Sequence, residues 1–340
     1  MSLHRPVWPP ATSKRIASIA TFGREIDHAC IATVRGLREA WVARVISFGL
    51  IVQAIFAGTT NGLTYALVGI GIAAIFKGTR VINVMQGEFS VTGAMVTVVA
   101  LNQLQLPYWL AICGGIFSGA LIGGLIEILF VRYMMRRGAN QQSFILLTIG
   151  IAVTMSASVL FFVGRSGYLL PAFGGDSVFV VWDAVIRTHA IWLIAITLVI
   201  AAGLRAFYHH TTLGLSMMAT SIDADGAATI GINVARMRTL TFVLGGILGA
   251  IAGILMTPLI SVDYTFGINL TLKGFAAAIL GGLTNPLGAV VGGVTLGLVE
   301  SLSTVFISSS YKDVISFGVL IVIMIVMPNG MLGRAGRQGG

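Results

Sequence analysis

The stretch RTLTFVLGGILGAIAGILMTPLI (residues 238–260) decides the fold class, because its only charged side chain is the first residue, Arg238. A helix needs about 20 apolar residues to cross a bilayer. Gly245, Gly249 and Gly253 recur every fourth residue, so they lie on one helix face and allow another helix backbone to approach closely. The stretch therefore predicts a membrane-spanning helix packed inside a bundle.

The rest of the chain repeats this pattern. Of 340 residues, 56% are hydrophobic and only 10% are charged, whereas a soluble domain carries about 25% charged residues. The other apolar segments are 46–76, 88–103, 107–131, 143–163, 189–207, 268–283, 287–307 and 313–330. Several are shorter than a full span, and Gly58, Asn61 and Gly62 could divide 46–76 into two crossings. We expect an all-α polytopic membrane protein, a bundle of about 8–10 transmembrane helices, some of them short or broken.

Glycine is abundant, with 43 residues. The four-residue spacing of the first stretch returns in two other segments, at Gly115, Gly119 and Gly123, at Gly288 and Gly292, and at Gly293 and Gly297. Such spacing predicts helices in close backbone contact.

The net charge of +9 is distributed as membrane insertion requires, not as nucleic-acid binding would require. Seven of the 21 Lys and Arg residues precede residue 46, and others cluster at 132–137, 236–238 and 334–337. Because basic residues concentrate in cytoplasmic segments, we expect a multi-pass inner-membrane protein with both termini cytoplasmic. Residues 1–45 form a basic amphipathic or partly disordered leader, 46–334 the transmembrane domain and 335–340 a tail. A cytoplasmic leader then requires 46–76 to cross twice.

Motifs for catalysis or nucleotide binding are missing from the sequence. It contains no G-x-x-x-x-G-K-[ST] loop, no H-E-x-x-H pair and no G-x-S-x-G turn. Its two cysteines, Cys30 and Cys113, lie in different settings and suggest no disulfide framework. We expect no catalytic residue, no metal and no cofactor, and any ATP would be bound by partner chains.

A few polar side chains within the apolar region are candidates for a substrate pathway, because ionisable groups there are costly. They are Asn83, Gln86, Glu88, Asn269 and Lys273. Glu127 and Glu300 are weaker candidates, since Glu127 can pair with Arg132 and Glu300 can form hydrogen bonds within the bundle.

The segment 208–237 is long and polar at its edges. Residues 223–230 can form a short helix that ends at Gly231 and is followed by Asn233. A short helix projecting from a membrane domain is suited to docking a soluble partner. The alternative is an ordinary interhelical loop, which would not need this length.

At this point the sequence resembles a known family, the branched-chain amino acid permeases of bacterial ATP-binding-cassette importers, specifically the LivH-type subunit. The resemblance runs from about residue 46 to 334. It is carried by NGLTYALVGIG (61–71), INVMQGEF (82–89), IGIN (230–233), RTLTFVLGGILGAIAG (238–253), LKGFAAAILGGLTNPLGAVVGG (272–293) and YKDVISFGVLIVIMIVMPNGMLGR (311–334).

The resemblance implies a coupling helix with the pattern E-A-A-x-x-x-G, which sits in a groove of an ATPase. Here the pattern reads D-G-A-x-x-x-G, and glycine at the second position lowers helix stability by about 0.5–1 kcal/mol. The implied coupling residues are Asp223, Asp225, Gly226, Ala227, Gly231 and Asn233. A second departure is at residues 84–88, where VMQGE replaces the family's aromatic–Ala–His–Gly–Glu stretch.

The partners implied by the resemblance are two cytoplasmic ATPases, a periplasmic solute-binding protein and a second permease, either LivM-like or another copy of this chain. The implied function is ATP-driven import of branched-chain or other small hydrophobic amino acids by alternating access. Urea, short amides or another small solute are alternative cargoes. An ion-coupled secondary transporter and a polytopic enzyme acting on lipid are more distant alternatives.

Overall fold

The computed structural model describes residues 48–332, apart from 176, 182–183, 284 and 328–329. The predicted leader (1–45) and tail (335–340) lie outside the described residues. Contacts divide the chain into Met1–Ile51 and Val52–Gly340, and the architecture below is that of the second unit.

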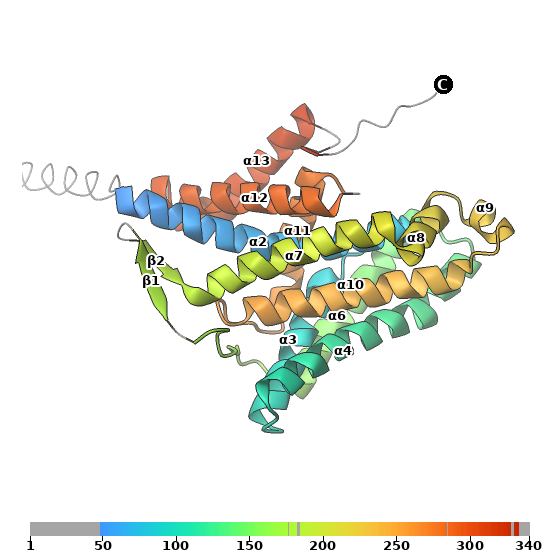
Figure 1. The fold of residues 1–340 in the computed structure, drawn as a ribbon, viewed down its shortest axis with the longest axis horizontal. Helices are drawn as coiled ribbons and strands as arrows, with labels where there is room; N and C mark the ends of the chain where they lie inside the picture. Colours follow the sequence, from blue (N-terminus) through green and yellow to red (C-terminus); the bar gives the residue numbers. More distant parts are fainter. Residues whose placement is uncertain (1–47, 176, 182–183, 284, 328–329, 333–340) are drawn as a thin grey trace, which may run out of the picture. The chain divides into compact units, whose positions relative to one another are not determined.

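Helices make up almost all of the described residues, as predicted (Figure 1). They are α2 (Phe48–Thr79), α3 (Gln86–Asn102), α4 (Tyr108–Ile126), the π-helix η1 (Glu127–Val131), α5 (Arg132–Arg136), α6 (Gln141–Phe162), α7 (Thr188–His210), α8 (Thr212–Ile222), α9 (Ala224–Thr229), α10 (Val234–Met256), α11 (Phe266–Gly281), α12 (Pro286–Phe306), the 3-10 helix η2 (Ser309–Tyr311) and α13 (Lys312–Val326).

Seven helical stretches within the described ranges are long and apolar enough to cross a membrane. Two more, α3 and α11, have only 17 and 16 residues. This confirms the expectation of a multi-pass bundle in which some helices are short.

Helix α2 corrects the expectation that 46–76 crosses twice, because it is one uninterrupted helix of 32 residues. At 1.5 Å per residue it is about 48 Å long, enough for one crossing of a hydrocarbon core of about 30 Å. Gly58 and Gly62, which the sequence suggested as breaks, instead lie against the backbone of α12 at Gly297 and Gly293. The glycines serve close packing, which short-range sequence reasoning does not distinguish from a break.

The late part of α2 lies beside the end of α7. The Tyr208 hydroxyl donates to the Ala74 carbonyl over 3.1 Å, and a Cβ on Gly78 would meet Thr241, in the second turn of α10. We call this end of the bundle, where α7 finishes, α8 and α9 lie and α10 begins, the α9 end. Residue 52 of α2 therefore lies toward the opposite end.

Close glycine packing holds the bundle together, as predicted. Gly119 of α4 lies against Gly246 of α10, and Gly253 of α10 lies against the backbone of Ser90 in α3. A side chain at these positions would collide with a neighbouring backbone, so the spacing of α3, α4 and α10 depends on glycine.

Two features were not predicted. Two short strands, β1 (Val178–Val181) and β2 (Ala184–Arg187), pair antiparallel, with Val178 opposite Arg187. The segment 208–237, expected to be a loop around one short helix, is mostly helical, because α8 precedes α9. The Thr211 side chain accepts from the Gly214 amide over 3.0 Å and so starts α8 directly after α7 ends.

Candidate functional site

The short helix α9 is defined at its start by Asp223. This residue is the N-cap, and its Oδ1 accepts a hydrogen bond of 2.9 Å from the Gly226 amide. A Cβ at position 226 would meet the Asp223 carboxylate. Glycine therefore fits here because the capping side chain occupies the space that an alanine would need.

The end of α9 is equally well defined. Gly231 has φ +86°, a conformation that favours glycine, and the Ile232 amide donates back to the Ala227 carbonyl over 3.0 Å. Asn233 then caps α10, with its side chain accepting from the Arg236 amide over 3.0 Å. The structure thus brings the six predicted coupling residues into one cap–helix–cap unit.

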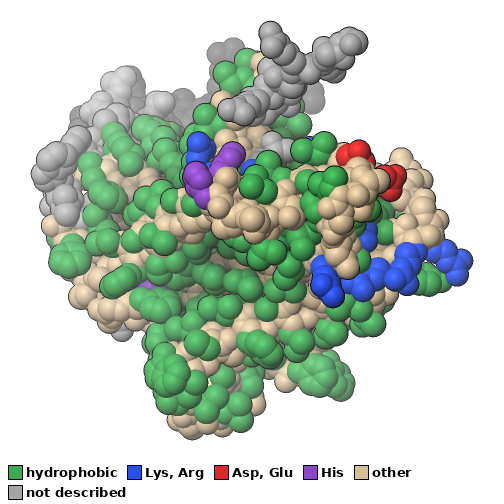
Figure 2. Space-filling model, turned by 45° about the vertical axis from the view of Figure 1, so that its right-hand side comes forward, with side chains coloured by type: hydrophobic (Ala, Val, Ile, Leu, Met, Phe, Trp, Pro, Cys, Tyr) green, Lys and Arg blue, Asp and Glu red, His purple; other side chains and the backbone are tan. Residues whose placement is uncertain are grey.

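The outer surface of this unit is both apolar and charged. Ile222 and Ile230, on either side of α9, are 73% and 75% exposed, whereas Ala227 is buried beneath them. Figure 2 shows acidic side chains close to a row of basic side chains at the α9 end. Exposed isoleucines on a short, capped helix form a suitable surface for a soluble protein.

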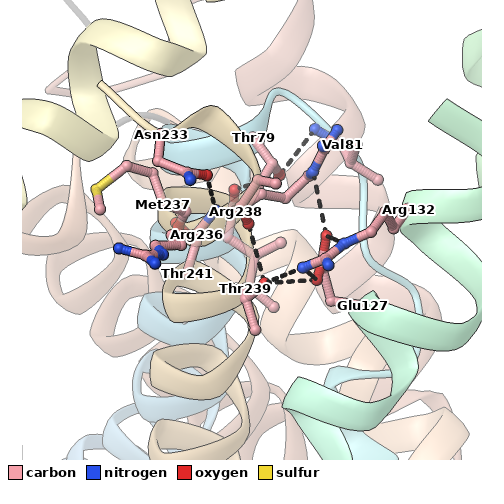
Figure 3. Close-up of polar contacts among 12 residues, drawn as sticks. Thr79, Val81, Glu127, Arg132, Asn233, Arg236, Met237, Arg238, Thr239 and Thr241 are labelled. Atoms are coloured by element: carbon pink, nitrogen blue, oxygen red, sulfur yellow. Dashed lines mark hydrogen bonds and ion pairs between the residues drawn. The ribbon is translucent and has the colours of Figure 1, made fainter. Parts of the chain in front are cut away.

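An ion network between η1, α5 and the early turns of α10 is centred on Glu127, which is fully buried (Figure 3). Its Oε2 is 3.0 Å from Nη2 of Arg132, and its Oε1 is 3.2 Å from Nε of Arg238. The Thr239 hydroxyl donates to Oε2 over 2.6 Å. The predicted pairing with Arg132 is present, but the two partners on α10 were not predicted.

Glu127 also lies where the helix geometry changes. It is the first residue of η1, the π-helical segment that continues α4. Single π-helical turns are rare and are frequent at functional sites. Asn233 caps α10, and Arg238 and Thr239 lie in its second turn, so α9 adjoins the helix that carries two partners of Glu127.

Three of the predicted pathway residues surround the break before α3 and are fully buried. The Asn83 amide donates to Gln86 over 3.2 Å, and the Gln86 amide donates to the Gly245 carbonyl over 2.9 Å. Neither carboxylate oxygen of Glu88 has a hydrogen-bond partner among the described residues. The hydrogen bonds of Asn83 and Gln86 stabilise the non-helical segment 80–85 inside the protein, as non-helical backbone at membrane depth requires.

The other two predicted pathway residues lie on α11. Asn269 is exposed and Lys273 is half-buried, and their four-residue spacing places them on one helix face. The Lys273 ammonium is 2.8 Å from Glu300 of α12 and 2.9 Å from Asp313 of α13. By helix spacing they lie on the face of α11 opposite Gly267 and Thr271, which contact Glu88 and Gly87 of α3.

A cavity in the described part of the chain contains none of these five residues. It has a volume of about 660 Å³ and lies among α3, α4 and α6, lined by Met95, Val99, Ile122, Met155 and Phe162 among others. Its walls are almost wholly apolar. The described residues also contain no group of three or more His, Cys, Asp or Glu that could hold a metal ion.

Comparisons with known proteins cover nearly all of the bundle. The model of a family described as the permease component of the branched-chain amino acid transport system matches residues 54–324. The chain is 33% identical over 300 residues to the high-affinity branched-chain amino acid transport system permease protein LivH of Escherichia coli K12, covering 83% of this chain and 95% of that relative.

More distant relatives also align. BraD, named as a high-affinity branched-chain amino acid transport system permease protein of Pseudomonas aeruginosa, is 29% identical over 298 residues, covering 83% of this chain and 95% of BraD. The ribose import permease RbsC of Haemophilus influenzae is 22% identical over 278 residues, covering 78% of this chain and 81% of RbsC.

Proposed function

This chain belongs to the branched-chain amino acid permease family, and we propose that it is the membrane-spanning subunit of an ATP-driven importer in a bacterial inner membrane. Members of this family are transport components and not enzymes. The observation that carries the proposal is α9, a short helix capped at both ends and flanked by the exposed Ile222 and Ile230, which adjoins α10, the helix that carries Arg238 and Thr239 of the Glu127 network.

Energy enters, in this proposal, through α9. Two cytoplasmic ATPases bind the transporter, and one of them binds α9 in a groove on its surface. When the ATPases close, α9 moves with them, and the cap at Asn233 transmits the movement to α10. Through Arg238 and Thr239 the movement reaches Glu127 and so α4. The ATPases shift the bundle between outward- and inward-open states only by contacting α9 differently in the two.

This assignment sets the membrane orientation. The α9 end is cytoplasmic. The start of α12 lies at this end, because Gly297 and Gly293 of α12 lie against Gly58 and Gly62 in the early part of α2. The C-terminal segment is cytoplasmic too, since the Met331 amide donates to the Leu280 carbonyl beside the start of α12. Residue 52 of α2 is then on the periplasmic side.

The cargo we propose is a branched-chain amino acid, as the names of LivH and BraD state for those relatives. A periplasmic binding protein delivers the amino acid to a pair of permeases, this chain with a LivM-like chain or with a second copy of itself. Residues 269 and 273 face this pathway, and 83, 86 and 88 support the break in the bundle beside it.

Reconstitution in proteoliposomes tests the proposal. The complete importer, with its binding protein, is assayed for uptake of leucine, isoleucine, valine, urea and acetamide. We expect uptake of the three amino acids, dependent on ATP on the side of the ATPases. Uptake of urea or acetamide without leucine would overturn the cargo. Uptake of leucine by this chain alone, driven by an ion gradient, would overturn the importer assignment in favour of a secondary transporter.

A further inference from the structure

A second ion network joins four helices on the part of the bundle away from the α9 end. Its centre is the Lys273 ammonium, which contacts Glu300, Asp313 and the Tyr65 hydroxyl, the last over 3.2 Å. Lys312 lies 3.6 Å from the same oxygen of Glu300. Glu300 is about two turns from the end of α12, and Asp313 is in the first turn of α13.

Two members of this network are open to the surroundings. The side chains of Asp313 and Lys312 are 55% and 44% exposed. Charged groups exposed to hydrocarbon are costly and usually face a water-filled cavity or another protein chain. Both residues lie in the first turn of α13, where exposed charged side chains reach water at the helix end.

One hydrogen-bonding position in the network is vacant. Glu300 is 96% buried, since its exposed fraction is 4%, and its Oε2 has no partner in the described part of the chain. A buried carboxylate oxygen without a hydrogen-bond donor calls for an explanation. The ammonium of Lys312 makes only the long contact of 3.6 Å to Oε1 of the same carboxylate.

We propose that this network is a binding site for the zwitterionic end of an α-amino acid. The ammonium of the amino acid donates to Glu300 Oε2 and to the exposed Asp313 carboxylate, while its carboxylate pairs with Lys312. The apolar side chain then extends along the neighbouring apolar surface of α13. The inference rests on the proposed function and adds to it the residues that distinguish an amino acid from an uncharged solute.

The charges of the site match this ligand. Lys273, Lys312, Glu300 and Asp313 together are neutral, so a zwitterion can replace internal contacts without leaving net charge. Urea or an amide carries no charge to pair with Asp313 or Lys312. A hydrogen bond to a charged group contributes about 1.5–3 kcal/mol.

The test compares single variants of the complete importer. Lys312→Gln and Glu300→Gln are each expected to reduce leucine uptake about tenfold, while stimulation of ATP hydrolysis by the binding protein is kept as the control for assembly. Tyr311→Phe, next to Lys312 and 59% exposed, is the matched control and should leave uptake unchanged.

Three outcomes distinguish failure of the binding site, failure of the proposed function and binding of lipid. If the wild-type importer takes up leucine and both charge variants keep that uptake, the binding site is wrong and the proposed function stands. If the wild type takes up no branched-chain amino acid, the proposed function fails first. The assays use phosphatidylcholine vesicles, because that headgroup has no N–H donor, whereas phosphatidylethanolamine carries the same pair of charges. An effect of the variants seen only with phosphatidylethanolamine would assign the site to lipid and overturn the proposal.

Discussion

Two ion networks stand at different depths of the bundle and are built in opposite ways. Around Glu127, a fully buried acid is surrounded by Arg132, Arg238 and Thr239, and both of its oxygens are bonded. Around Lys273, Asp313 and Lys312 are partly exposed, and one oxygen of the buried Glu300 has no partner among the described residues. The first network is closed and holds α4 to α10. The Lys273 network has one carboxylate oxygen without a partner among the described residues and two exposed charged side chains, as a site that binds and releases a ligand needs.

The largest expected effect is from neutralising the acid of the closed network. Glu127→Gln removes a fully buried carboxylate and leaves Arg132 and Arg238, whose side chains are 26% and 14% exposed, without their acid, which costs about 3 kcal/mol of unfolding free energy. Unfolding in detergent by titration with sodium dodecyl sulfate measures this loss. A loss below about 1 kcal/mol would show that water already solvates the two arginines.

The same substitution in the open network should cost less. In Glu300→Gln, Lys273 keeps Asp313 at 2.9 Å and the Tyr65 hydroxyl, so the expected loss is about 1–2 kcal/mol. The measurement is the same titration. If Glu300→Gln destabilised the protein more than Glu127→Gln, the contrast between a closed and an open network would be wrong.

A smaller effect is expected from one hydroxyl of the closed network. Thr239→Val removes the hydrogen bond to Glu127 and the bond that its oxygen accepts from Arg132 over 2.8 Å, at a cost of about 1 kcal/mol. Thr295→Val is the matched control, because its hydroxyl bonds only to the Val291 carbonyl of its own helix. Equal losses in the two variants would remove Thr239 from the network.

Salt should produce the smallest difference. Exposed ion pairs are screened by salt and buried pairs much less. Raising the salt concentration should therefore lower the stability cost of Asp313→Asn, by about 0.5 kcal/mol, and leave the cost of Glu127→Gln unchanged. The opposite dependence would mean that the Glu127 network is open to solvent.

The helices could be predicted from the sequence because an apolar stretch is a local property. The predicted segment 189–207 lies within α7, Thr188–His210, and 287–307 is shifted by one residue from α12, Pro286–Phe306. The prediction for α2 failed where a local pattern has two meanings. Gly58 and Gly62 could break a helix or pack against one, and only the position of α12 decides between them.

The site residues show the same limit. The six residues around α9 are close in sequence, so caps and a terminating glycine were sufficient to group them. Arg132 is five residues from Glu127 and was a predictable partner, whereas Arg238 is 111 residues away. Lys273, Glu300 and Asp313 belong to three helices, and nothing in one sequence showed that they meet. Their contacts follow from the packing of α11, α12 and α13.

Docking of an ATPase on α9 is the central claim, and one comparison tests it most directly. Ile230→Lys places a charge on the exposed apolar surface of α9, and Leu332→Lys does the same at a 46% exposed leucine of the C-terminal segment. Both variants are assayed for co-purification with the ATPase and for ATP-dependent leucine uptake. We predict that Ile230→Lys loses both and that Leu332→Lys keeps both. Full co-purification and uptake with Ile230→Lys would contradict the account.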